Sequence, residues 1–298
     1  MLERFAHFLL KRSRNAALVA FLCSILPVFF GSISVMIVAL VTLRKGEREG
    51  FSVLAWGALP LLARAFVDKS YLFFSAAVIA FVLVWGMAAL LRRYSSWSVL
   101  LEVSALLGVC AVLVTLVFRE NIVVWWSGHI SDYMKVIVNA GYLKADEVLS
   151  PAQVLWLAQV ASGIEVLILL LLAGFKLAVA RWWEGRVVKT IEFRQELIQA
   201  RLDRWALLLF VVLLLAALGL KAIVFVEALI PLVGCYVVAG LCLLHYWMQG
   251  YKYARSALFG FYMVMVIFPY AIALALVLGL VDSGLNLKVK MLEHNVKK

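Results

Sequence analysis

Long apolar stretches recur along this chain and constrain its fold more than any other feature. Residues 16–43 carry no charge, and further apolar stretches cover residues 51–66, 71–91, 97–118, 153–180, 205–220, 222–249 and 257–281. Because a bilayer core of about 30 Å requires about 20 apolar residues per helix, these stretches predict membrane helices. We therefore expect an all-α, polytopic transmembrane helical bundle of about eight or nine hydrophobic segments, built as one integral membrane domain over residues 1–298.

The composition supports this fold class and limits the partners. Hydrophobic residues make up 66% of the chain and charged residues 15%, whereas a soluble domain has about 45–50% and about 25%. The net charge of +11 comes mostly from Lys and Arg beside the apolar stretches, which is the pattern of topology determinants at a membrane. It indicates contact with the lipid bilayer and argues against nucleic-acid binding. The four cysteines lie inside apolar stretches without CxxC spacing, so we expect no metal site and no cofactor.

The first stretch contains Pro27 and Gly31 near its middle, and these residues predict a split. Proline removes a backbone donor and glycine permits a turn, so we expect two short segments that meet at Pro27–Gly31. With two passes, the basic residues before position 16 and those at 44–48 lie on one side of the membrane, as the positive-inside rule requires. A re-entrant hairpin is the alternative, because each half has only about a dozen residues.

The same rule places the N-terminus in the cytoplasm, together with the basic residues at 92–93, 181–204 and 252–255. Nine crossings leave the lysines at 288, 290, 297 and 298 on the other side. Either the tail breaks the rule, or one weak segment does not cross.

Two connecting segments show helical patterns. Residues 119–150 predict a non-cytoplasmic loop with an amphipathic helix, whose apolar positions include Ile130 and Met134. Residues 181–204 predict a cytoplasmic amphipathic segment, which is either a solvated helix or a docking surface. Ser150 and Gln153 predict a capping box that starts the next helix at Pro151.

Ionisable residues within apolar stretches are costly and therefore become candidates for function. Glu165 is the strongest, since it lies near the middle of its stretch and follows Ser162 closely; its carboxyl either faces a ligand or ion, or bonds to another helix. Glu227 is a further candidate for ligand binding, although an interfacial position is the simpler explanation. Pro231 and Pro269 are candidate helix breaks, which in transporters often mark a binding site, but prolines also merely kink membrane helices.

Signatures of catalysis are missing from the sequence. It contains no HExxH, GxSxG or GxxxxGK[ST], and its four histidines do not cluster. We therefore expect no enzymatic activity.

Several stretches carry a family resemblance: "FRQELIQARLDRW", "GLCLLHYWMQG", "LGLVDSGLNLK" and the split first span that ends "LVTLRKG". They resemble the YybS-like family of predicted bacterial inner-membrane proteins, a domain of unknown function. That family is distantly similar to the substrate-binding S-components of energy-coupling-factor transporters. The resemblance implies a multi-pass helical fold in the bacterial inner membrane that cradles a small molecule. It also implies that a small-residue pair, here Ala16 and Ala20, packs against a membrane partner.

Two functions follow as hypotheses. The first is a small-molecule binding or transport subunit, with Glu165, Ser162 and Glu227 at the ligand. The alternative is a structural or assembly membrane protein that binds a cytoplasmic partner, with Arg194 and Arg201 as contacts.

Overall fold

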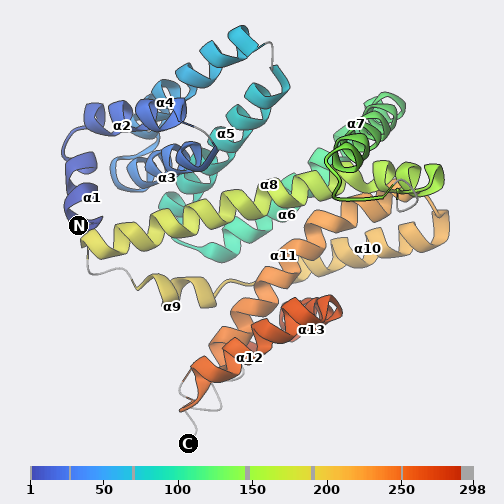
Figure 1. Ribbon diagram of the computed structural model, residues 1–298. Coiled ribbons are helices and arrows are strands. Elements are labelled where there is room, and N and C mark those ends of the chain that lie inside the picture. The colour runs from blue at the N-terminus through green and yellow to red at the C-terminus, as the bar shows by residue number, and fades with distance from the viewer. Residues whose placement is uncertain are drawn as a thin grey trace, which may run out of the picture. The chain divides into compact units, whose positions relative to one another are not determined.

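The structure is a computed structural model that describes residues 2–26, 28–68, 71–144, 148–188, 192–249 and 251–289. This part of the chain is helical and contains no strand, as the sequence predicts (Figure 1). Five of its helices are long and apolar enough to cross a membrane: Glu47–Val67, Phe74–Tyr94, Trp97–Thr115, Pro151–Val188 and Ile223–Trp247. The chain is therefore a multi-pass, all-α membrane protein.

Where the sequence predicts one domain over residues 1–298, the chain packs as two compact units. The first comprises Met1–Leu100 and Leu169–Ala200, and the second comprises Leu101–Ile168 and Arg201–Lys298. Two helices, α6 (Trp97–Thr115) and α8 (Pro151–Val188), contribute residues to both units. The remaining helices of the first unit are α1 (Leu2–Lys11), α2 (Ser13–Ile25), α3 (Val28–Lys45), α4 (Glu47–Asp68), α5 (Tyr71–Tyr94) and α9 (Phe193–Ile198).

Small residues let the helices of the first unit approach closely. Within it, α2, α3, α4 and α5 pack against one another. A Cβ atom at Gly50 of α4 would lie 2.0 Å from Thr42 Oγ1 of α3, and one at Gly57 would lie 3.0 Å from Ser34 Oγ. Glycine is therefore required on α4 where it crosses α3.

The first apolar stretch breaks, as the sequence predicts, but the break is shorter than expected. α2 ends at Ile25 and α3 begins at Val28, with Leu26 in an extended conformation (φ −80°, ψ 156°). A residue before proline is driven out of the helical region by the proline ring, which explains Leu26. Pro27 itself lies outside the described residues. Gly31 is already helical within α3, so the prediction that the break extends to Gly31 is wrong.

The two halves fold back on each other. Ser24 Oγ donates to Ser34 Oγ at 2.9 Å, and Ser34 Oγ donates to the Ala20 carbonyl at 2.9 Å. At the open end of this hairpin, Lys45 Nζ donates to Ser13 Oγ at 3.2 Å. The basic residues before α2 and after α3 therefore lie at one end of the unit, which is the arrangement that two passes require.

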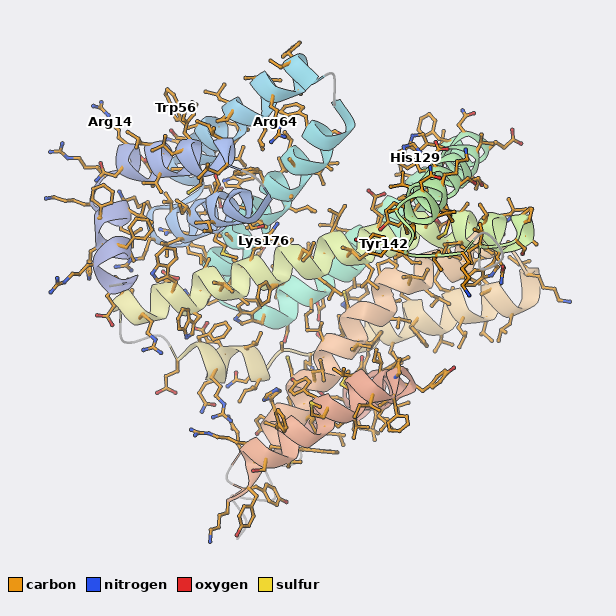
Figure 2. All side chains as sticks on the ribbon, viewed as in Figure 1. Arg14, Trp56, Arg64, His129, Tyr142 and Lys176 are labelled. Carbon is orange, nitrogen blue, oxygen red and sulfur yellow. The ribbon has the colours of Figure 1, made fainter. Side chains whose placement is uncertain are left out.

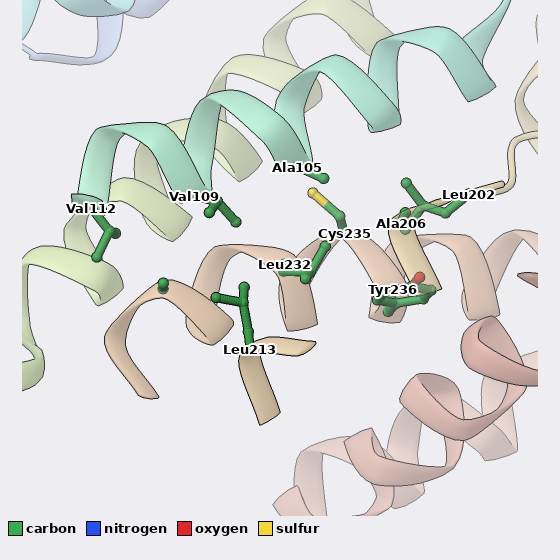
Figure 3. Close-up of a cluster of buried hydrophobic side chains, with 10 residues drawn as sticks. Ala105, Val109, Val112, Leu202, Ala206, Leu213, Leu232, Cys235 and Tyr236 are labelled. Carbon is green, nitrogen blue, oxygen red and sulfur yellow. The ribbon is translucent and has the colours of Figure 1, made fainter. Parts of the chain in front are cut away.

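The second unit contains η1 (Leu116–Phe118), α7 (Arg119–Asn139), α10 (Arg204–Leu220), α11 (Ile223–Trp247), α12 (Ala254–Ile267), η2 (Pro269–Ala271) and α13 (Ile272–Leu285). Its core joins α6, α10 and α11 (Figure 3). The buried side chains at the centre of this core come from Ala105, Val109, Val112, Leu202, Ala206, Leu213, Ala228, Leu232, Cys235 and Tyr236.

The predicted span 257–281 is two helices, because the chain breaks at Pro269. Its second half, α13, packs against α11 (Figure 1). A Cβ atom at Gly240 would lie 1.8 Å from the Ala275 carbonyl oxygen, and one at Gly279 would lie 2.2 Å from that of Tyr236. Tyr236 meets the later residue Gly279, whereas Gly240 meets the earlier residue Ala275. The two helices therefore run in opposite directions where they cross.

The end of α13 lies beside the start of α10. Ser283 Oγ donates to the Asp203 carbonyl at 3.0 Å, and Asp203 directly precedes α10. Since α10 also packs against α11, the helices α10, α11 and α13 form one packed group within this unit.

Candidate functional site

The acidic side chain of α11 lies against a glycine of α8. Glu227 is only 4% exposed, and its Oε1 accepts a hydrogen bond from the backbone N–H of Gly163 at 3.3 Å. A Cβ atom at Gly163 would lie 2.6 Å from the carbonyl oxygen of Glu227 and 2.9 Å from its Cγ. Only glycine at position 163 allows the two backbones to come this close.

Pro231 adds a second acceptor at the same place. Pro231 lies within α11, and the helix continues through it without interruption. The prediction that Pro231 breaks the helix is therefore wrong. Proline has no N–H, however, and the residue four positions earlier is Glu227. The Glu227 carbonyl consequently lacks its usual donor within the helix, and it faces Gly163 of α8. Glu227 thus presents both its carboxylate and its backbone carbonyl to one short segment of α8.

Ser162, next to Gly163, connects this segment to α7. The indole Nε1 of Trp126 donates to Ser162 Oγ at 3.1 Å, and Ser162 is buried. Trp126 also packs edge-to-face on Trp125 at 4.8 Å between ring centroids. The structure therefore brings together Ser162 and Glu227, two candidates predicted from the sequence. Trp126 bonds to Ser162, and the neighbouring Gly163 bonds to Glu227.

A groove of about 860 Å³ lies between α7 and the start of α8. Its lining residues are Ser127, Ser131, Met134, Lys135, Val138 and Asn139 of α7, and Val148, Leu149, Pro151, Val154 and Leu155 at the start of α8. The Trp126–Ser162 hydrogen bond joins the same two helices outside this lining. Figure 2 labels His129 on α7 and Tyr142 just beyond it, which mark this part of the second unit.

The predicted elements that form the groove are present. The amphipathic helix expected within residues 119–150 is α7, and α8 starts at Pro151. The capping box is confirmed: the Ser150 N–H donates to Gln153 Oε1 at 2.8 Å, and the Gln153 N–H donates to Ser150 Oγ at 3.4 Å. It fixes where α8 begins, and with it the apolar wall of the groove.

One exposed ion pair lies on the rim of the groove. Lys135 Nζ lies 2.9 Å from Asp132 Oδ1, and both side chains are largely exposed. The hydrogen bond and charge of Lys135 lower the pKa of the Asp132 carboxyl below its usual value.

Glu165, the strongest candidate from the sequence, does not join this site. It lies on an exposed face of α8. Positions two residues apart on a helix differ by about 200° around its axis, so a helix that turns Gly163 toward α11 turns Glu165 away. The sequence indicates the depth of Glu165 but not the face on which it lies.

The residues predicted to contact a partner differ in how exposed they are and in what they contact. Ala16 and Ala20 are fully buried in the first unit, where α2 packs on α3 and α4, so their small-residue face is already used within the chain. Arg194 is exposed on α9. Arg201 forms an ion pair with Asp203 at 2.6 Å.

The cytoplasmic segment predicted at 181–204 is more buried than a solvated helix. Arg181 on α8 lies 2.8 Å from Glu184 and 2.8 Å from Glu196 of α9, and the side chain of Glu184 is 4% exposed. This ion triad ties α9 to the end of α8. Because Lys189, Thr190 and Ile191 lie outside the described residues, the segment is described on either side of them.

Trp126 and Gly163 were not recognisable as site residues from the sequence, where Trp126 indicates an interfacial anchor and Gly163 is one glycine of many. The spacing of Glu227 and Pro231 by four residues was the available signal. Within the described residues, no group of His, Cys, Asp and Glu side chains could hold a metal ion. The fold and the site define a multi-pass helical membrane protein with a buried carboxyl beside a groove. No known protein family, curated protein or solved structure matches this chain.

Proposed function

We propose that this protein is a small-molecule binding or transport subunit of a membrane, and that the α7–α8 groove holds the ligand. The observation that carries the proposal is the groove of about 860 Å³ between α7 and the start of α8, two helices that the Trp126–Ser162 hydrogen bond also joins. A volume of this size falls within the range of small-molecule sites, which are largely apolar with a few convergent polar groups.

The proposal extends to family and location. The stretches quoted from the C-terminal third support membership of the YybS-like family, with similarity to S-components. The basic residues at the open end of the α2–α3 hairpin support a cytoplasmic N-terminus, and the family resemblance supports the bacterial inner membrane.

Native mass spectrometry of protein extracted in mild detergent tests ligand binding. We expect a stoichiometric small-molecule adduct on the wild type and on Glu165→Gln, which changes an exposed carboxyl on the same helix. Ser131→Trp fills the groove and should abolish the adduct, and Glu227→Gln should weaken it. An adduct that survives Ser131→Trp, or its absence from folded wild type, contradicts the proposal.

A second function is favoured by a specific contact, the Arg181–Glu196 ion pair that holds α9 against α8. It presents the exposed Arg194 on a fixed helix, as a structural or assembly protein with a cytoplasmic partner requires. Co-purification with Arg194→Glu tests this function. Loss of a partner that the wild type retains would favour it, and an unchanged set of bound proteins would exclude Arg194 as a contact.

A further inference from the structure

The two walls of the groove differ in chemistry. On α7, Ser127, Ser131, Lys135 and Asn139 follow one another at intervals of four, so they line one face of the helix. Their span of twelve residues corresponds to about 18 Å of helix. The opposite wall, at residues 148–155, is apolar. A matching occupant is elongated, with oxygen acceptors on one side and hydrocarbon on the other.

The charge of the groove selects among such molecules. Lys135 is the one ionised side chain among its described lining residues. The partner of Lys135, Asp132, is on the same helix and 75% exposed, and exposed pairs of this kind contribute little. The ammonium can therefore bind a second anion at small cost, whereas a cation gains nothing from this wall.

The surface of α7 indicates where the occupant comes from. Val124, Tyr133 and Val136 are exposed on α7, with exposed fractions between 62% and 73%. A helix that exposes apolar and aromatic residues beside membrane spans is typical of one that lies at the bilayer boundary. The groove beneath it is then open to membrane lipid.

We propose that the groove binds an anionic phospholipid of the bilayer, with the phosphate at Lys135 and Asn139 and an acyl chain along residues 148–155. This inference rests on the proposed function, because it assigns the ligand class of the same groove. Lys135 holds the headgroup, and the Ser127 hydroxyl donates to an ester oxygen. The Ser131 hydroxyl already donates to the Ser127 carbonyl at 2.8 Å.

Lipid titration followed by native mass spectrometry tests the assignment. The probes are dioleoyl phosphatidylglycerol and, as the neutral match, dioleoyl phosphatidylcholine, added to delipidated protein in detergent. We expect tighter binding of the anionic lipid. Lys135→Glu should reduce that affinity at least about fivefold, since one lysine near an anionic surface contributes about this factor. Asp132→Asn should raise it, because it frees Lys135. Lys144→Glu, at the same end of the unit but outside the groove lining, is the control and should change it little.

The outcomes separate the two proposals. Equal binding of both lipids, or anionic binding that is insensitive to Lys135→Glu, overturns the lipid assignment. If Ser131→Trp still abolishes a different adduct in that case, the groove remains a ligand site and only its ligand class is wrong. If Ser131→Trp changes no adduct at all, both proposals fail.

Discussion

The backbone N–H of Gly163 on α8 donates to the carboxylate of Glu227 on α11 across 3.3 Å, although 64 residues separate them in the chain. This contact brings a buried carboxyl to the helix that also forms one wall of the groove. The α8–α11 crossing is thus a close packing contact that buries a carboxyl against the helix whose start lines the groove.

Gly163→Ala should destabilise the second unit by about 1–3 kcal/mol, because the new Cβ overlaps the Glu227 backbone and overpacking costs this much. Gly174→Ala on the same helix meets no atom within 4 Å and should be neutral or stabilising by up to about 1 kcal/mol, since alanine favours helix. Thermal unfolding in detergent measures both. Equal melting temperatures for the two variants would show that α8 and α11 are not in close contact.

Gly279→Ala should separate α13 from α11. Its Cβ would lie 2.2 Å from the Tyr236 carbonyl oxygen, a backbone atom that cannot rotate away. We expect a loss of about 3 kcal/mol or slightly more by the same mechanism. Gly260→Ala on α12, where nothing lies within 4 Å, is the matched control. A tolerated Gly279→Ala would contradict the close crossing of α11 and α13.

Lys288 predicts a pH dependence. Its side chain is 7% exposed, and burial lowers its pKa below the usual lysine value, an effect that the nearby Asp282 carboxylate opposes. The unfolded chain then binds more protons than the folded chain between the lowered pKa and the usual value of about 10.4. The contribution of Lys288 to the free energy of unfolding should therefore increase as the pH rises through this window. This contribution should be lost as the pH falls through the folded pKa.

The difference in unfolding free energy between wild type and Lys288→Met isolates this effect. It should shift in favour of the wild type as the pH is raised toward about 10.4. A shift in favour of Lys288→Met over the same range would indicate that pairing with Asp282, rather than burial, dominates.

The ion triad of α8 and α9 makes a stability prediction for the first unit. Arg181→Met leaves Glu184 buried without its cation, which costs about 3–5 kcal/mol for a fully buried pair and less here, because Arg181 is 13% exposed. Arg194→Met, at an exposed position, should change stability by less than about 0.5 kcal/mol. Limited proteolysis near Phe193 should detect release of α9 in the first variant alone. Similar cleavage of both variants would argue that the triad does not hold α9.

Local sequence signals determined much of the fold. Apolar length specifies membrane helices, and this physical requirement does not depend on neighbours. Proline at position 27 and the capping box at Ser150 act within a few residues of themselves, so the split of the first stretch and the start of α8 were predictable. The extent of the first break was not, since glycine permits a turn without requiring one.

Only the tertiary structure decided which polar residues meet. Glu165 and Glu227 look equivalent as carboxyls in apolar stretches, but the rotation of a helix about its axis depends on what packs against it. Gly163 fits α11 closely and turns α8 so that Glu165 faces outward. The packing of α13 on α11 likewise depends on the close crossing at Gly240 and Gly279, which are 39 positions apart in the chain. The sequence by itself determined the kind of helices and where several of them begin and end, because those depend on local chemistry; the packing of helices distant in the chain decided the site.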